Sequence, residues 1–173
     1  SNAYIYTRYG NPTLSVAEKK IAALGGAEAA VVAASGMAAI SSALLAALKA
    51  GDELISTAQV YGGTYRLMRD VFPNFGITVH HVGTGLSGME SLVTPRTKAL
   101  YIETPTNPTL RLVDIHKAVN FAKKHKLVSI IDNTFATPIL QNPIALGYDM
   151  VVHSATKALA GHSDILAGVA VGS

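Results

Sequence analysis

The sequence of 173 residues contains no cysteine, and this absence excludes a disulfide scaffold and a metal site built on thiolates. Charged residues are also scarce, at 14% of the chain, against roughly 25% in ordinary soluble domains. Hydrophobic residues make up 49%, which excludes disorder and favours a β-sheet that is buried on both faces. The length suits one domain of ordinary size.

Other familiar sequence signals are absent as well. The net charge is only +3 and no basic run occurs, so nucleic-acid binding is not favoured. No window approaches the roughly 20 apolar residues of a transmembrane helix, so we expect no membrane span and a soluble, cytoplasmic protein. The patterns G-x-G-x-x-G, Walker A and G-x-S-x-G are missing, which argues against nucleotide binding and serine hydrolysis. The six histidines show no metal-ligand spacing, so we predict no metal site.

The two ends of the chain suggest a piece of a longer protein. Residues 1–3, Ser-Asn-Ala, look like the remnant of a cleaved expression tag. Residues 4–14 read as an extended N-terminal arm, and we expect residues 15–173 to form one domain. Because the chain stops just after the apolar segment 166–171, we expect that a C-terminal domain is missing.

Seven short apolar segments have the length of buried strands, and helical patterns lie between most of them. This alternation predicts an α/β fold with a mostly parallel sheet and helices on both faces. The seventh segment follows the sixth too closely for a parallel crossover, so we expect it to run antiparallel to its neighbours. The predicted strands are 29–34, 53–57, 77–82, 99–103, 128–132, 150–154 and 166–171.

Four helices are predicted from their ends and their apolar spacing. Ser15 and Glu18 form a capping-box pattern at the start of the first helix. Ser35 and Asp114 are the expected N-caps of the second and fourth helices, and Pro73 is expected to end the third. The predicted ranges are 16–24, 36–49, 65–72 and 115–126.

The first predicted ligand site is the helix that opens at residues 35–37, Ser-Gly-Met. Its free amides and the positive end of its dipole suit an anion, and Gly36 would let a phosphate approach closely. Parallel α/β sheets bind ligands beyond the C-terminal ends of their strands, so groups that follow other strands should gather at this edge. Taken alone, a Ser-Gly pair is more often a simple N-cap turn.

Three further side chains follow predicted strands and could act at the same edge. Lys157 follows the sixth strand, and a lysine in a partly buried cleft can form a Schiff base. Asp132 closes a strand so apolar that its carboxylate needs a partner. Tyr61 lies in a glycine-rich turn, where its ring could stack on a planar cofactor. The simpler alternatives are a solvated lysine, a cap or turn aspartate and a packing tyrosine.

Together these segments resemble the Cys/Met-metabolism family of pyridoxal-phosphate enzymes, the trans-sulfuration group with the type I fold. The resemblance runs over nearly the whole chain and rests on six motifs in order. It implies that the chain is the large cofactor domain of such an enzyme, without the small C-terminal domain. The motifs are Tyr6–Thr13, Ser35–Met37, Tyr61–Thr64, Glu103–Pro108, Asp132–Thr134 and Ser154–Asp164.

The resemblance also implies a role for each site residue. Lys157 would carry the cofactor as a Schiff base and later move the substrate's proton, and Tyr61 would stack on the ring and take part in catalysis. Asp132 would pair with the ring nitrogen, and Asn107 would hydrogen-bond the 3-oxygen of the ring. The phosphate would be held by Gly36, Met37, Ser154 and Thr156, and by Tyr6 and Arg8 from a neighbouring subunit.

The implied activity is elimination or replacement of a β- or γ-substituent on sulfur amino acids or activated homoserine, in a homodimer or homotetramer. Gly63 occupies a position where methionine γ-lyases commonly have cysteine, which favours cystathionine β/γ-lyase or γ-synthase chemistry. The alternatives are an O-acetylhomoserine sulfhydrylase or methionine γ-lyase, and a cofactor-binding module without catalysis. The family's carboxylate-binding arginine lies in the small domain, so we expect this chain to bind cofactor weakly without full turnover.

Overall fold

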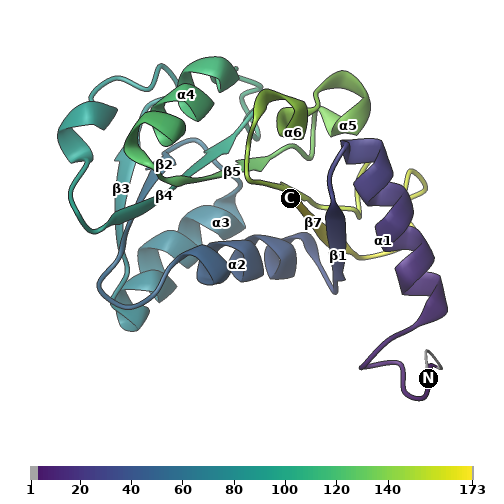
Figure 1. Ribbon diagram of the computed structural model, residues 1–173. Helices are drawn as coiled ribbons and strands as arrows, with labels where there is room; N and C mark the ends of the chain where they lie inside the picture. Colours follow the sequence, from purple (N-terminus) through teal and green to yellow (C-terminus); the bar gives the residue numbers. More distant parts are fainter. Residues whose placement is uncertain (1–3, 173) are drawn as a thin grey trace.

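A seven-stranded sheet forms the centre of the computed structural model, which describes residues 4–172 (Figure 1). The strand order is β1-β7-β6-β5-β4-β2-β3. β7 runs antiparallel to both β1 and β6, and the other neighbours are parallel, so the predicted fold class and the antiparallel last strand are confirmed. The strands are β1 (Ala29–Ala33), β2 (Glu53–Thr57), β3 (Thr78–Val82), β4 (Thr97–Glu103), β5 (Val128–Asp132), β6 (Met150–His153) and β7 (Gly168–Gly172).

Helices cover both faces of the sheet, as predicted (Figure 1). α2, α3 and η1 pack on the face that carries Leu54 and Ile130, and α1, α4 and α6 pack on the face that carries Ile55 and Ile131. The central strands are therefore buried on both sides, which accounts for the low charge content. The helices are α1 (Pro12–Gly25), α2 (Gly36–Ala47), α3 (Gly62–Arg66), α4 (Ile115–His125), α5 (Thr137–Leu140) and α6 (Pro143–Leu146), with the π turn η1 (Leu67–Val71) and the 3₁₀ turns η2 (Phe72–Phe75) and η3 (Met89–Leu92).

The first helix begins four residues before its predicted start, and the prediction that Ser15 caps it is wrong. Asn11 is the N-cap, because its side-chain oxygen accepts hydrogen bonds from two amides of the first turn. Glu18 instead accepts a hydrogen bond from the amide of Val32 at 3.1 Å, which links α1 to β1. Residues 12–14, assigned above to the arm, are thus helical. The predicted tag at residues 1–3 lies outside the described residues.

The other helices match the predictions unevenly. Ser35 and Asp114 cap α2 and α4 through their side-chain oxygens, as expected. The helix predicted over residues 65–72 starts earlier, at Gly62, and changes to π and then 3₁₀ geometry. Pro73 lies inside the 3₁₀ turn rather than ending the segment, because a proline in the first turn loses no intrahelical bond. The short helices α5 and α6 were not predicted.

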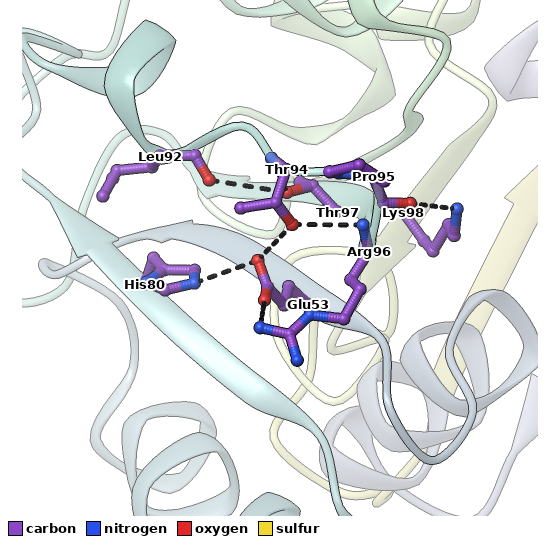
Figure 2. Close-up of polar contacts among 8 residues, drawn as sticks. All are labelled: Glu53, His80, Leu92, Thr94, Pro95, Arg96, Thr97 and Lys98. Carbon is purple, nitrogen blue, oxygen red and sulfur yellow. Dashed lines mark hydrogen bonds and ion pairs between the residues drawn. The ribbon is translucent and has the colours of Figure 1, made fainter.

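At the edge where the strands begin, three side chains cover the carboxylate of Glu53 (Figure 2). It accepts a hydrogen bond from the Thr94 hydroxyl at 2.8 Å, pairs with Arg96 at 2.5 Å, and lies 3.3 Å from His80 Nε2. The Glu53 side chain is only 2% exposed, but Arg96 is 69% exposed, so the carboxylate is covered at the surface rather than deeply buried. The hydrogen bond from Thr94 and the charge of Arg96 lower the pKa of Glu53.

Two findings bear on the predicted absences. No helix in the part of the chain that the structure describes combines the length and the apolar character needed to cross a membrane. Among residues 4–172, histidine and acidic side chains form no group of three that could hold a metal ion.

Candidate active site

A pocket of about 220 Å³ lies at the sheet edge where β4, β5 and β6 end. The structure brings most of the predicted site residues together here, although they come from five separate segments. Their shared location agrees with the expectation that polar groups following parallel strands meet at one edge. The predicted residues that line the pocket are Gly36, Met37, Tyr61, Asn107, Asp132, Ser154, Thr156 and Lys157.

The N-terminus of α2 forms one wall of the pocket. Ser35 caps the amide of Ala38 at 3.1 Å, and the amides of Gly36 and Met37 belong to the first turn, which has no intrahelical acceptors. A Cβ at Gly36 would lie 2.7 Å from Cβ of Ser154 and 3.0 Å from its Cα. The glycine therefore lets α2 pack against the end of β6. The expectation that Gly36 also makes room for a phosphate stays a prediction.

Asp132 is the last residue of β5 and is 5% exposed. Its Oδ1 accepts hydrogen bonds from the Thr134 hydroxyl at 2.6 Å and the Thr134 amide at 3.0 Å. Its Oδ2 accepts one from the Tyr101 hydroxyl at 3.4 Å. The same Thr134 hydroxyl accepts from the Ser154 amide at 2.8 Å, so Thr134 connects the carboxylate to the end of β6. Burial raises the pKa of Asp132, against the hydrogen bonds from Thr134.

Glu103, the last residue of β4, is a second buried carboxylate on the pocket, and the sequence analysis did not assign it to the site. Its Oε2 accepts the amide of Tyr61 at 2.6 Å, and its Oε1 accepts the amide of Asn107 at 3.0 Å. Burial and the charge of Asp132 raise the pKa of Glu103 to about 7. The signal that identified Asp132, an acid at the end of an apolar strand, was equally present at Glu103.

The lysine loop follows β6 and carries Lys157, an exposed residue that lines the pocket. Thr156, two residues beyond Ser154, is engaged within the chain. Its hydroxyl donates to the carbonyl of Ala167 at 3.0 Å and accepts from the Ala167 amide at 2.9 Å, which fixes the loop to the segment before β7. A hydrogen bond from Thr156 to a phosphate would require this O–H to change its acceptor.

Tyr61 and Gly63 shape the side of the pocket that follows β2. The Tyr61 side chain is 48% exposed, and its Cε1 atom would lie 2.6 Å from a Cβ placed at Gly63. Any larger residue at 63 would therefore move this ring. A ring that is half exposed and next to a pocket can stack on a planar ligand.

Tyr6 and Arg8 are not among the residues that line this pocket. The guanidinium of Arg8 lies 5.3 Å from the ring centre of Tyr6 and 5.2 Å from that of Tyr9. The arm that carries them is exposed and extends away from the sheet (Figure 1). This placement agrees with the expectation that they point away from their own site, and their role in a neighbouring subunit stays a prediction.

The charges of the pocket define the kind of ligand that fits. Neither Asp132 nor Glu103 forms a salt bridge with another described residue, although both are buried. Buried carboxylates without a cation are costly, so a cationic group would be favoured beside them. The α2 amides suit an anion, and Lys157 offers an amine. An anion site, an amine and two buried carboxylates around one pocket fit pyridoxal phosphate, the cofactor that the family resemblance implies for this mostly parallel α/β domain.

The chain belongs to the family described as Cys/Met metabolism PLP-dependent enzymes, which matches residues 1–173. L-methionine gamma-lyase of Pseudomonas putida is 43% identical over 98% of this chain and 43% of its own length. Cystathionine beta-lyase MetC of Bacillus subtilis is 47% identical over 97% of this chain and 43% of its own length. The crystal structure of cystathionine gamma-lyase from Lactobacillus plantarum matches with a TM-score of 0.94 and 47% identity, covering 99% of this chain and 45% of that one.

The predicted family is thereby confirmed, and pyridoxal phosphate is the cofactor of that family. The chain spans less than half the length of the relatives it matches. The domain boundaries and the individual residue roles stay predictions.

Proposed function

We propose that the protein is a pyridoxal-phosphate enzyme that eliminates or replaces a β- or γ-substituent of sulfur amino acids or activated homoserine. The observation that carries this proposal is that Asp132, Lys157 and the N-terminus of α2 line the same pocket. When bound, the cofactor supplies an electron sink for the substrate's α-carbon. The names of the relatives support this reaction class.

Each pocket residue has a defined task under this proposal. The amine of Lys157 binds the cofactor and, once released, takes and returns the proton at the α-carbon. The Asp132 carboxylate would accept a hydrogen bond from the protonated ring nitrogen and so keep that proton in place. The Asn107 side chain would donate to the 3-oxygen of the ring, and Tyr61 would stack on the ring. Gly36, Met37 and Ser154 would hold the phosphate, with Thr156 as a further donor.

The choice of substrate is the finer part of the proposal. We favour cystathionine β- or γ-lyase or γ-synthase chemistry, with Gly63 next to Tyr61 as the supporting feature. Methionine γ-lyase and O-acetylhomoserine sulfhydrylase chemistry are the alternatives, and the relatives with these names are as similar as the cystathionine enzymes. A panel of cystathionine, methionine and O-acetylhomoserine, scored for ammonia, 2-oxo acid and thiol, separates them.

We further propose that turnover needs groups beyond this chain. A bidentate arginine is the residue suited to hold a substrate carboxylate. Arg69 pairs with Asp70 and Arg96 pairs with Glu53, and no arginine occurs among the described residues that line the pocket. Tyr6 and Arg8 would reach the site of a second copy, in a homodimer or homotetramer. Light scattering tests the assembly.

The decisive experiment for cofactor binding is a pyridoxal-phosphate titration of the chain, followed by the visible absorbance of the lysine-bound cofactor. The wild-type chain should develop this absorbance, and Lys157→Ala should abolish it. The matched control is Lys49→Ala, which removes an exposed lysine outside the pocket and should leave the absorbance unchanged. Equal absorbance from Lys157→Ala would contradict the assignment of the lysine. The absence of absorbance from the wild-type chain would contradict cofactor binding.

A further inference from the structure

Glu103 connects two loops that carry predicted ligand contacts. Tyr61 follows β2 and Asn107 follows β4, and these strands are neighbours in the sheet. One Glu103 oxygen accepts the Tyr61 amide at 2.6 Å and the other accepts the Asn107 amide at 3.0 Å. Both bonds are made to backbone groups. The ring of Tyr61 and the side-chain amide of Asn107 therefore stay available to a ligand.

We propose that Glu103 is a positioning residue that holds Tyr61 and Asn107, one through each carboxylate oxygen, and so sets the ring-binding side of the pocket. The proposal rests on the proposed function for the identity of the ligand. Hydrogen bonds that a carboxylate accepts are charge-assisted and stronger than neutral ones, and Glu103 accepts two of them, which fixes both loops relative to β4. Misplacing a binding group by about 1 Å can lower a rate on the order of 10²-fold.

The protonation state of Glu103 determines whether both bonds are strong. An ionised carboxylate accepts at both oxygens, whereas a protonated one has an O–H on one oxygen and accepts less well there. The titratable groups around Glu103 are the Asp132 carboxylate, the Tyr61 and Tyr101 phenols, and the Lys157 amine on the same pocket. Because the pKa of Glu103 is raised to about 7, the connection should weaken as the pH falls below neutrality.

The test compares the wild-type chain with Glu103→Gln, in which the amide N–H₂ faces one of the two backbone donors. Amide hydrogen exchange without cofactor should show protection of Tyr61 and Asn107 reduced roughly 10-fold or more. Affinity for pyridoxal phosphate should fall about 10-fold at pH 8 but less than about 3-fold at pH 6, where the wild-type carboxyl is itself protonated. The matched control is Glu53→Gln at the opposite edge, which should change neither measurement.

The outcomes separate this proposal from the proposed function. If the wild-type chain binds no pyridoxal phosphate, the proposed function fails, and the exchange measurement still tests Glu103. If both amides keep their protection in Glu103→Gln, the positioning role is wrong. If protection falls but affinity and its pH dependence stay the same, Glu103 is only a structural anchor and the proposal is overturned. If Glu103→Gln does not fold, Glu103→Asp gives the same test, because its shorter side chain cannot reach both amides.

Discussion

Glu53 and Glu103 are both covered carboxylates at strand ends, but they lie at opposite edges of the sheet and have opposite environments. Glu53 starts β2, where Thr94, Arg96 and His80 surround its oxygens (Figure 2). Glu103 ends β4, where its partners are two backbone amides and its charged neighbour is another carboxylate. Accordingly, the pKa of Glu53 is lowered and that of Glu103 is raised.

The two edges of the sheet differ in whether the chain's own side chains balance the charge of the buried carboxylates. At the edge where the strands begin, the positive charge of Arg96 offsets the negative charge of Glu53. At the edge where the strands end, Glu103 and Asp132 lie together without a salt bridge to any described residue. Natural proteins accept such a cost at functional sites, where the ligand supplies the missing charge. The difference therefore supports a cationic ligand at the pocket.

The largest expected effect on stability comes from Glu103→Gln, which should stabilise the chain, whereas most substitutions destabilise a protein. Because the pKa rises from 4.5 to about 7, the folded chain keeps a proton that the unfolded chain releases in this interval. The free energy of unfolding therefore falls as pH rises through this window, by roughly 3 kcal/mol in total. The lost hydrogen bond costs about 1 kcal/mol, so the variant should be about 2 kcal/mol more stable than wild type at pH 8.

The measurement is urea unfolding followed by circular dichroism, at pH 5 and pH 8, for both proteins. At pH 5 the wild-type carboxyl is mostly protonated, so the variant should be equal to wild type or slightly less stable. A stability difference that is the same at both pH values would contradict the raised pKa of Glu103. If Glu103→Gln is more stable than wild type but binds the cofactor less tightly, then Glu103 improves cofactor binding and lowers the stability of the fold.

The sequence predicted this sheet well because strand burial is encoded locally. The apolar runs identified all seven strands, and the short distance between β6 and β7 identified the antiparallel return. The start of α1 was missed because Ser15 and Glu18 have the spacing of a capping box. In the structure Asn11 is the N-cap, and Glu18 accepts a hydrogen bond from the amide of Val32 in β1, a tertiary contact that local sequence does not show.

The pocket residues were predicted from their positions after strands, but the bonds between them were not. Thr134 links Asp132 to Ser154, and Glu103 links Tyr61 to Asn107, in each case across separate segments. Such links depend on which strands are neighbours and on side-chain directions, and neither is written in local sequence. The same holds for Gly36, whose need to be small comes from the end of β6.

A moderate loss of stability is expected from Glu53→Gln, at the edge where the strands begin. The change removes the charge that pairs with Arg96 and weakens the contacts with Thr94 and His80. Since Arg96 is 69% exposed, solvent screens the pair, and the loss should be about 1–2 kcal/mol rather than the value of a deep ion pair. Thermal unfolding should shift down by roughly 2–4 °C for each kcal/mol.

The pH dependence of this effect provides its control. The pKa of Glu53 is lowered below 4.5, so its contribution is present above that value and is lost as pH falls through the folded-state pKa. The difference between wild type and Glu53→Gln should therefore be full at pH 7 and should shrink under acid conditions. A larger difference in acid than at pH 7 would contradict the lowered pKa. Cofactor affinity should be the same in both proteins.

The smallest effect on stability is expected from Glu90→Gln, which tests whether an ion pair stabilises the fold when its carboxylate is exposed to solvent. Glu90 contacts Lys124 and His125 at 2.8 Å each, so by contact distances it resembles Glu53. Its side chain is 60% exposed, however, and exposed ion pairs are screened by water and salt. His125 also packs against Phe121 with ring centres 4.6 Å apart, so it keeps its place without the carboxylate. The thermal unfolding temperature of Glu90→Gln should match that of wild type at low and high salt. A loss of stability as large as that of Glu53→Gln would show that the ion pair itself, rather than the burial of the carboxylate, stabilises the fold.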